Sequence, residues 1–128
     1  MRILGIGTDI IECSRIQRMI DKHGTSFYKR VYTESENLYC QSHQASVIHY
    51  SGRWAAKEAI MKALGTGWAK GVQWTDIEVK NEPGGKPIVH LSGVAAELME
   101  AEGDFHIDLS ITHCKEYAVA FAIATVPH

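Results

Sequence analysis

The sequence lacks a hydrophobic run long enough to cross a membrane. Its longest uncharged apolar stretch, residues 118–126, has the length of a strand, whereas a membrane-spanning helix needs about 20 residues. The N-terminus meets acidic residues at positions 9 and 12 and has no small-residue cleavage site, so it predicts a first strand and not a signal peptide. We therefore expect a soluble, cytoplasmic protein that makes no membrane contact.

Cysteines are few, and charge of one sign is not in excess. Cys13, Cys40 and Cys114 are odd in number and include no CxxC pair, which argues against a disulfide framework and a zinc knuckle. The formal net charge is only −2, whereas nucleic-acid-binding domains usually carry a strong basic excess. We expect no nucleic-acid partner.

What is present indicates one ordinary folded domain. The chain has 128 residues, of which 45% are hydrophobic and 22% charged, and it shows no linker, repeat or low-complexity tract. We therefore treat residues 1–128 as a single domain. A chain this short has little material left to enclose a large substrate, so a neighbouring subunit is expected to complete the site.

The order of patterns predicts an α+β fold with an antiparallel sheet and one long packed helix. Ser14 is expected to cap a first helix that stops at Gly24, and residues 33–36 fit a capping box. The longest helix is expected over residues 45–64, closed by Gly65. Further elements are expected as a helical turn over 27–31, a helix over 92–102, and strands over 2–11, 76–80, 87–91, 105–112 and 117–126.

The last two strands differ in pattern. Apolar residues alternate over 105–111, which places Ser110 and Thr112 on the opposite, polar face together with positions 106 and 108. The strand over 117–126 is apolar at nearly every position, so we expect both of its faces to be buried.

Two carboxylates stand in apolar surroundings. Asp9 ends an apolar strand, where it serves either as an ordinary turn or capping residue or as a ligand for a bound group. Glu58 lies among small and apolar residues of the long helix, and Lys62 follows it on the same face. A surface ion pair between Glu58 and Lys62 is the simple alternative to a role in chemistry.

Cations and glycine turns accompany these carboxylates. Arg53, Lys57 and Lys62 share one helix, and glycine turns lie at residues 65–67 and 84–85, the second followed by a lysine. Two carboxylates beside cations and flexible turns suit a magnesium ion held against phosphate groups, whose oxygens complete its coordination. Gly65 by itself is equally explained as a helix C-cap.

Two further patterns suggest binding surfaces. The hydroxyls of Ser110 and Thr112, beside His113, suit a phosphate or ribose, although a lone histidine is often structural. Residues 12–30 hold five basic side chains against two acidic ones in a chain that is negative as a whole. This segment is either a solvated helix face or a docking patch for an acidic partner, with Met19 and Phe27 as apolar anchors.

Taken together, these blocks resemble the short, bacterial type of 4'-phosphopantetheinyl transferase, the holo-acyl-carrier-protein synthases. The resemblance covers nearly the whole chain, with the blocks in family order. It rests on residues 5–10 (GIGTDI), 27–34 (FYKRVYTE), 52–59 (GRWAAKEA), 62–67 (KALGTG), 76–79 (DIEV), 85–87 (GKP) and 110–113 (SITH).

The resemblance implies an enzyme that moves the 4'-phosphopantetheine arm of coenzyme A to a serine of apo-acyl carrier protein. It implies release of adenosine 3',5'-bisphosphate, a place in fatty acid biosynthesis, and Mg²⁺ held by Asp9 and Glu58, with Lys62 as the third catalytic residue. Either Glu58 or a metal-bound water would accept the serine proton. Coenzyme A would contact Arg53, Lys62, Gly65, Thr66, Gly67, Gly85, Lys86, Pro87, Ser110, Thr112 and His113, and the carrier protein would dock on Arg15, Met19, Phe27 and Arg30.

The same resemblance implies a homotrimer with active sites between subunits. Two other interpretations stay open: a non-catalytic oligomer that binds coenzyme A or a nucleotide, and a structural interaction module whose charges are merely solvated. The paired carboxylates Asp9 and Glu58 favour the enzyme, because nucleotide binding alone does not require them. Residues 39–50 carry no role that the resemblance assigns.

Overall fold

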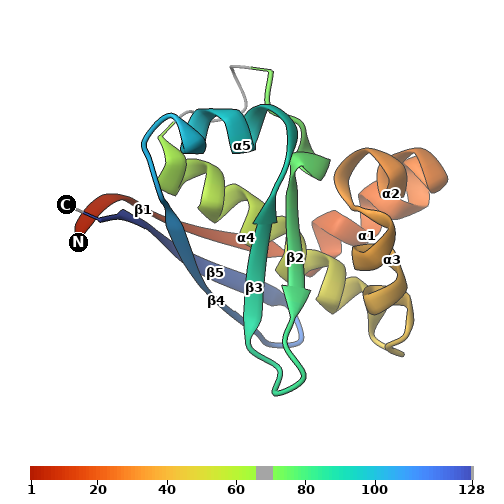
Figure 1. Cartoon of the computed structure of the whole chain (residues 1–128). Helices are drawn as coiled ribbons and strands as arrows, with labels where there is room; N and C mark the ends of the chain where they lie inside the picture. Colours follow the sequence, from red (N-terminus) through yellow and green to blue (C-terminus); the bar gives the residue numbers. More distant parts are fainter. Residues whose placement is uncertain (66–70, 128) are drawn as a thin grey trace.

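Helix α4 lies between a three-stranded sheet and a two-stranded hairpin (Figure 1). The structure is a computed structural model that describes residues 1–65 and 71–127. The sheet has the antiparallel order β1-β5-β4, formed by β1 (Arg2–Glu12), β5 (Tyr117–Val126) and β4 (His106–His113). The hairpin consists of β2 (Ile77–Asn81) and β3 (Pro87–Leu91).

Three short helices gather at one end of the molecule, and the two chain termini lie at the other (Figure 1). These helices are α1 (Cys13–His23), α2 (Thr25–Val31) and α3 (Glu34–Gln41). The remaining elements are α4 (Ser46–Leu64), a short 3₁₀ turn η1 (Trp74–Asp76) and α5 (Gly93–Glu100). The expected α+β class with antiparallel strands and one long packed helix is confirmed.

Local signals set several helix ends correctly, but α1 does not begin as expected, and the helix expected to reach residue 102 ends at Glu100. The Thr33 capping box is present, because Thr33 Oγ1 accepts from the Glu36 N–H and Glu36 Oε1 accepts from the Thr33 N–H at 2.8 Å. The expected Ser14 cap is wrong, since α1 begins at Cys13 and Glu12 holds the N-cap position. The reason is tertiary: β1 continues to Glu12, and the Cys13 N–H donates to the Glu116 carbonyl at 2.8 Å.

Two glycines let β1 lie directly on α4. A Cβ added at Gly5 would come within 2.2 Å of the Ala63 carbonyl oxygen, and one at Gly7 within 1.9 Å of the Ala59 oxygen. Both clashes are with helix backbone, which cannot rotate away as a side chain can. Alternate residues of a strand share a face, so Asp9 continues the row of Gly5 and Gly7 towards α4.

Replacing Gly7 with alanine should lower the free energy of unfolding by about 1–3 kcal/mol, because the strand must move off the helix to admit the methyl group. Urea unfolding measures this loss. The matched control is Gly84→Ala, since Gly84 has no atom within 4 Å of an added Cβ and no positive φ. An equal effect of the two substitutions would contradict the close β1–α4 contact.

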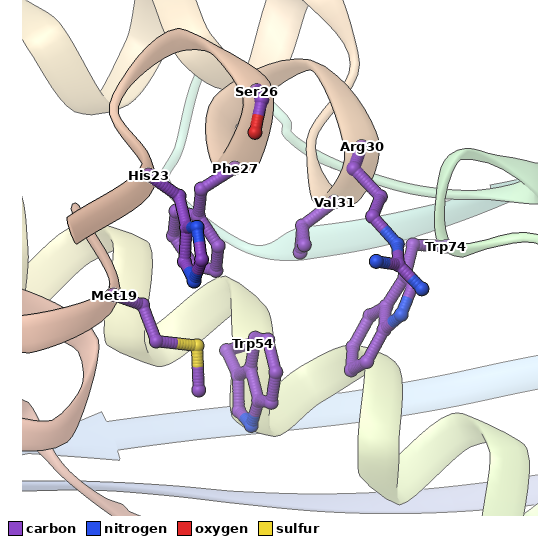
Figure 2. A pocket seen from close by; sticks show the side chains of 8 residues that line it. All are labelled: Met19, His23, Ser26, Phe27, Arg30, Val31, Trp54 and Trp74. Carbon is purple, nitrogen blue, oxygen red and sulfur yellow. The ribbon is translucent and has the colours of Figure 1, made fainter.

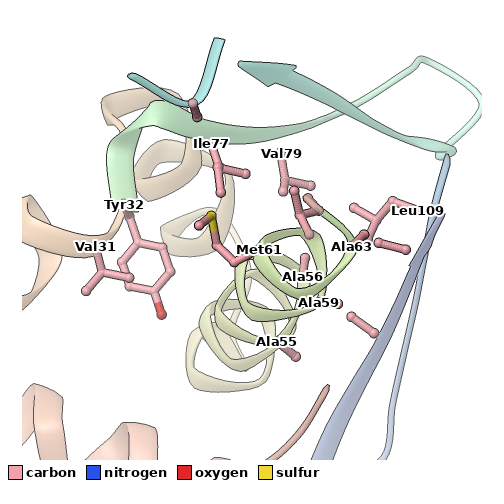
Figure 3. Packing of buried hydrophobic residues seen from close by; sticks show 14 of the residues in the cluster. Val31, Tyr32, Ala55, Ala56, Ala59, Met61, Ala63, Ile77, Val79 and Leu109 are labelled. Carbon is pink, nitrogen blue, oxygen red and sulfur yellow. The ribbon is translucent and has the colours of Figure 1, made fainter. Parts of the chain in front are cut away.

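The core lies on both sides of α4. Figure 3 shows Ile77 and Val79 of β2 on one side of the helix and Leu109 of β4 on another. Small residues Ala55, Ala59 and Ala63 are fully or almost fully buried. Their short side chains allow close packing of helix on sheet, which fixes where the functional side chains of α4 point.

The expectation that both faces of the last strand are buried is wrong for the single chain. The alanines at positions 118, 120, 122 and 124 are buried beneath α4, but Phe121 on the other face is 42% exposed. Ile6 and Ile10 of the neighbouring β1 are 60% and 63% exposed. In the register of the sheet, Ile6 pairs with Ile123 and Ile10 with Val119, so these residues form one open apolar face.

Candidate functional site

Asp9 lies in a partly buried position beside a lysine. Its side chain is 17% exposed, and Lys62 Nζ lies 3.5 Å from Asp9 Oδ1 while donating to the Thr8 carbonyl at 2.8 Å. Burial raises the pKa of Asp9, although Lys62 and, more weakly, Arg15 act to lower it. The carboxylate therefore lies in a place that favours an additional positive charge.

Glu58 lies one helical turn before Lys62 on α4 and is partly buried, as expected from its neighbours. Lys62 contacts Asp9 and shares a helix face with Glu58, which is four residues earlier. Among the described residues, no three histidine, cysteine, aspartate or glutamate side chains converge as a metal-binding group. Asp9 and Glu58 would therefore gain no third histidine, cysteine, aspartate or glutamate ligand from the described residues.

A cavity on another side of α4 is lined by several of the expected coenzyme A contacts. It has a volume of about 140 Å³ and lies between α3, α4, the β2–β3 hairpin and the end of β4. Arg53, Gly85, Pro87 and His113 line it, as the resemblance implies. Arg53 is 4% exposed, and its Nη2 donates to Asn81 Oδ1 at 2.5 Å.

Other expected contacts lie elsewhere. Ser110 and Thr112 lie on the open face of the sheet, because they pair with Phe121 and Val119, whereas Ile111 between them lines the cavity. Lys86 lines a different cavity, beyond the hairpin. Gly65 is the left-handed C-cap of α4, with φ of 78°, and Thr66 and Gly67 lie outside the described residues.

The carboxylate pair and the Arg53 cavity occupy two sides of α4. Asp9 pairs with Ala120 in the sheet, and Ala120 pairs with Ile111 of the cavity wall. Asp9 on β1 and Ile111 on β4 are separated by two strand spacings, which is about 10 Å. Helix α4 packs over β5, the strand between them. Within one subunit the two groups therefore do not share a single open cleft.

A separate cavity is lined by three of the four residues expected to dock an acidic partner. Met19, Phe27 and Arg30 line a hollow of about 280 Å³ between α1, α2 and α4, and Arg15 lies outside it, close enough to Asp9 to influence its pKa. Figure 2 shows Arg30 alongside Trp74, with Trp54 on the floor of the hollow. Trp54 and Trp74 stack with ring centroids 4.3 Å apart.

One expected phosphate-facing cation is a core residue. Lys57 is fully buried and forms a 2.8 Å ion pair with Glu36, which is also fully buried. Its Nζ donates to the Trp74 carbonyl at 2.9 Å and to the Ile77 carbonyl at 2.5 Å. Lys57 faces away from Lys62, since five residues on a helix leave a net rotation of about 140° between them. Its contacts hold α4 to α3 and β2.

Sequence reasoning missed some cavity residues. Tyr39 and His49 line the Arg53 cavity, although residues 39–50 had no assigned role. The available signal was spacing, because His49 and Arg53 are four residues apart on one helix and share a face. The sequence placed Trp54 on the long helix, but its stacking on Trp74 depends on the position of η1, a separate element.

Known proteins of one family match this chain along most of its length. The family model described as the 4'-phosphopantetheinyl transferase superfamily matches residues 5–122. Curated relatives named holo-[acyl-carrier-protein] synthase include those of Protochlamydia amoebophila (46% identical; 94% of this chain, 96% of the relative) and Solibacter usitatus (47%; 94% and 97%).

Solved structures agree. The holo-[acyl-carrier-protein] synthase of Neisseria meningitidis has a TM-score of 0.89 at 33% identity, covering 97% of this chain and 99% of that one. A holo-(acyl-carrier-protein) synthase of Bacillus anthracis in complex with coenzyme A has a TM-score of 0.80 at 40% identity, with 97% of both chains covered. The chain therefore belongs to the holo-[acyl-carrier-protein] synthases of the 4'-phosphopantetheinyl transferase superfamily, and it is a 4'-phosphopantetheinyl transferase.

Proposed function

We propose that this holo-[acyl-carrier-protein] synthase needs Mg²⁺, releases adenosine 3',5'-bisphosphate from coenzyme A and serves fatty acid biosynthesis. The observation that carries the proposal is the contact of Lys62 with Asp9, one helical turn from Glu58. This contact places Asp9 and Lys62 next to the helix face that carries Glu58, and Trp54, one turn before Glu58, lines the hollow of Met19, Phe27 and Arg30. An acceptor protein and a phosphate donor would meet there.

The residues fit a magnesium ion by their chemistry. Magnesium is typically bound by one or two carboxylates, with substrate phosphate oxygens and waters completing the shell. Asp9 and Glu58 would hold it, and the raised pKa of Asp9 marks a carboxylate that lacks sufficient compensating charge in this chain. When bound, the ion would neutralise charge that builds on the phosphate oxygens during transfer.

The chain's own residues would orient the reaction. In the transfer, the serine oxygen forms a bond to the β-phosphorus of coenzyme A. The bond from that phosphorus to the bridging oxygen breaks, and this oxygen leaves as part of adenosine 3',5'-bisphosphate. Lys62 is 55% exposed and donates to the Thr8 carbonyl, so its ammonium is held beside Asp9 where an incoming substrate phosphate could accept from it. Glu58 is this chain's own candidate to accept the serine proton.

The hollow between α1, α2 and α4 supports docking of an acidic carrier protein. Its apolar walls include Met19 and Phe27, while Arg30 at its edge and the exposed Arg15 nearer Asp9 provide positive charge. Trp54 in this hollow precedes Glu58 by one turn of α4. A carrier protein seated here would therefore bring its serine close to the carboxylate pair.

We expect Arg30→Glu to raise the KM for apo-acyl carrier protein at least tenfold at low salt, because repulsion replaces attraction at an exposed contact. The KM for coenzyme A should change less than twofold. Added salt should narrow the difference from the wild type, since screening weakens both effects. A KM for the carrier protein that is unchanged at low salt would remove Arg30 from the docking surface.

We propose a homotrimer, and the divided site and the open sheet face support a site shared between subunits. The carboxylate pair and the Arg53 cavity lie on two sides of α4, so a substrate as long as coenzyme A would span them more readily across a subunit boundary. The exposed apolar residues of β1 and β5 supply a surface for that boundary. Burial of such a face is favourable at about 25 cal/mol per Å².

Phe121→Lys should convert the oligomer to monomers at micromolar concentration, because it places a charge in the centre of this apolar face. Sedimentation velocity measures the change, and binding of coenzyme A should weaken in parallel. Lys115→Ala, an exposed substitution outside this face, is the control. A Phe121→Lys protein that remains trimeric, or a monomer with full activity, would contradict the shared site.

One experiment tests the proposed reaction directly. The protein is incubated with apo-acyl carrier protein and coenzyme A, with magnesium or with EDTA, and the carrier protein is weighed by mass spectrometry. A serine-linked phosphopantetheine gain only with magnesium, and release of adenosine 3',5'-bisphosphate, would support the proposal. Unchanged mass with bound coenzyme A would instead indicate a binding protein, and transfer in EDTA would refute the metal requirement.

A further inference from the structure

Three histidines lie together where α3, α4 and the end of β4 meet. The His43 and His49 ring centroids are 3.9 Å apart, and those of His49 and His113 are 5.6 Å apart. His43 comes from the α3–α4 connection, where its Nδ1 lies 2.8 Å from the Tyr39 carbonyl oxygen. Tertiary structure thus builds a histidine stack, formed by His43, His49 and His113, from three separate segments.

The histidine stack borders the Arg53 cavity. His49 and His113 line that cavity directly, and His43 lies against His49. Arg53 is buried, its guanidinium lies 3.9 Å from the Tyr39 ring centroid, and within the described residues its Nε has no hydrogen-bond partner. A buried charged donor without a partner is costly, so this cavity favours an anion as its occupant.

Burial and the charged neighbours of His49 all act on its pKa in the same direction. Burial lowers its pKa, and the neighbouring His43, His113 and Arg53 lower it further. Tyr39 faces it from α3, and no carboxylate lines the cavity among the described residues. These surroundings therefore favour the neutral form of His49, and an anion in the cavity would favour its protonated form.

We propose that His49, backed by His43, is a further substrate-binding residue that takes up a proton when a phosphate monoester of coenzyme A enters the Arg53 cavity. The inference rests on the proposed function for the identity of the ligand, but its chemistry is that of any phosphate monoester dianion. A protonated imidazole donates a charge-assisted hydrogen bond to the phosphate, alongside the unused Arg53 Nε.

The sign of the pH effect follows from linkage. The pKa of His49 lies below its ordinary value in the free protein and rises when the anion binds, so proton uptake accompanies binding between those two values. Affinity therefore increases as the pH falls through the raised pKa of His49 in the bound form. Below about 6 the phosphate itself becomes protonated, which ends the gain.

Calorimetric titration with adenosine 3',5'-bisphosphate tests this inference at pH 6.5 and 8.0, without magnesium. Two buffers of different ionisation enthalpy report the protons taken up at each pH. We expect about tenfold tighter binding at pH 6.5, with net proton uptake. His49→Gln should lose most of the uptake and of the pH dependence, and His43→Gln should lose part of both.

The control is His90→Gln, which removes an exposed histidine of β3 that lies outside the cavity and should leave uptake unchanged. Circular dichroism verifies that each variant is folded, and His43→Gln, in a connecting segment, keeps the test available if His49→Gln does not fold. Equal proton uptake by the wild type and the folded histidine variants would overturn the inference, as would equal wild-type affinity at both pH values.

The outcome is separable from the proposed reaction. If the wild type transfers the arm to the carrier protein but binds adenosine 3',5'-bisphosphate without proton uptake, the role of His49 is wrong and the proposed function stands. If proton uptake on binding is found while no transfer occurs, the phosphate site stands and the proposed function is wrong.

Discussion

Replacing Glu58 with alanine should reduce phosphopantetheine transfer about a thousandfold or more while the protein stays folded. One of the two carboxylates that would hold the magnesium ion is then gone, and losing a group that stabilises transition-state charge costs roughly a factor of 10²–10³. Loss of a candidate proton acceptor adds to this effect. Alanine is a strong helix former, so α4 itself is not expected to suffer.

The rate is measured by the appearance of holo-carrier protein, and coenzyme A binding is titrated with and without magnesium. Glu97→Ala is the matched control, because Glu97 is an exposed glutamate of helix α5. Glu58→Ala should lose the part of coenzyme A binding that depends on metal, whereas Glu97→Ala should retain both binding and rate. Near-normal turnover by soluble, folded Glu58→Ala would reject the assignment.

Replacing Lys57 with methionine should lower the free energy of unfolding by about 3–5 kcal/mol, the usual cost of removing one partner of a buried ion pair. Glu36 would keep the hydrogen bonds from the Thr33 and Val79 N–H groups but lose its counter-charge. The Trp74 and Ile77 carbonyls would lose their buried donor as well. α4 would then be less firmly held against α3 and β2.

Urea unfolding at a fixed protein concentration measures this loss, since assembly also contributes to stability. The double variant Glu36→Gln, Lys57→Met should recover a large part of it, because no isolated charge stays buried. Lys80→Met is the surface control: Lys80 lies 3.6 Å from Glu78 but is 52% exposed, so its loss should be below 1 kcal/mol. Similar losses for Lys57→Met and Lys80→Met would contradict a buried pair.

Local patterns predicted most of the fold. The capping box at Thr33, the left-handed stop at Gly65 and the two-residue alternation of β4 each depend on residues close in the sequence, so they were readable without tertiary information. The start of α1 was misjudged because the β1–β5 ladder, and not a capping side chain, decides where that helix begins.

Burial was harder to predict than secondary structure. The outward face of β5 is as apolar as a core strand, yet Phe121 is exposed in the single chain. The sequence could not predict this exposure, because apolarity alone does not reveal whether the same chain or another chain covers a surface. Lys57 and Lys62 look alike as basic residues of one helix. Side chains five residues apart on an α-helix point in directions that differ by about 140°, so one lysine lies in the core against Glu36 and the other beside Asp9.

The sequence by itself determined the family and the α+β class, and it singled out Asp9 and Glu58 as the proposed metal ligands, since these rest on ordered local motifs. Only the tertiary structure decided which charges face the site. It separated the carboxylate pair from the Arg53 cavity across α4, and it brought His43, His49 and His113 together from distant segments. The physical reason is that contacts between distant segments depend on strand register and helix packing, which no local pattern encodes.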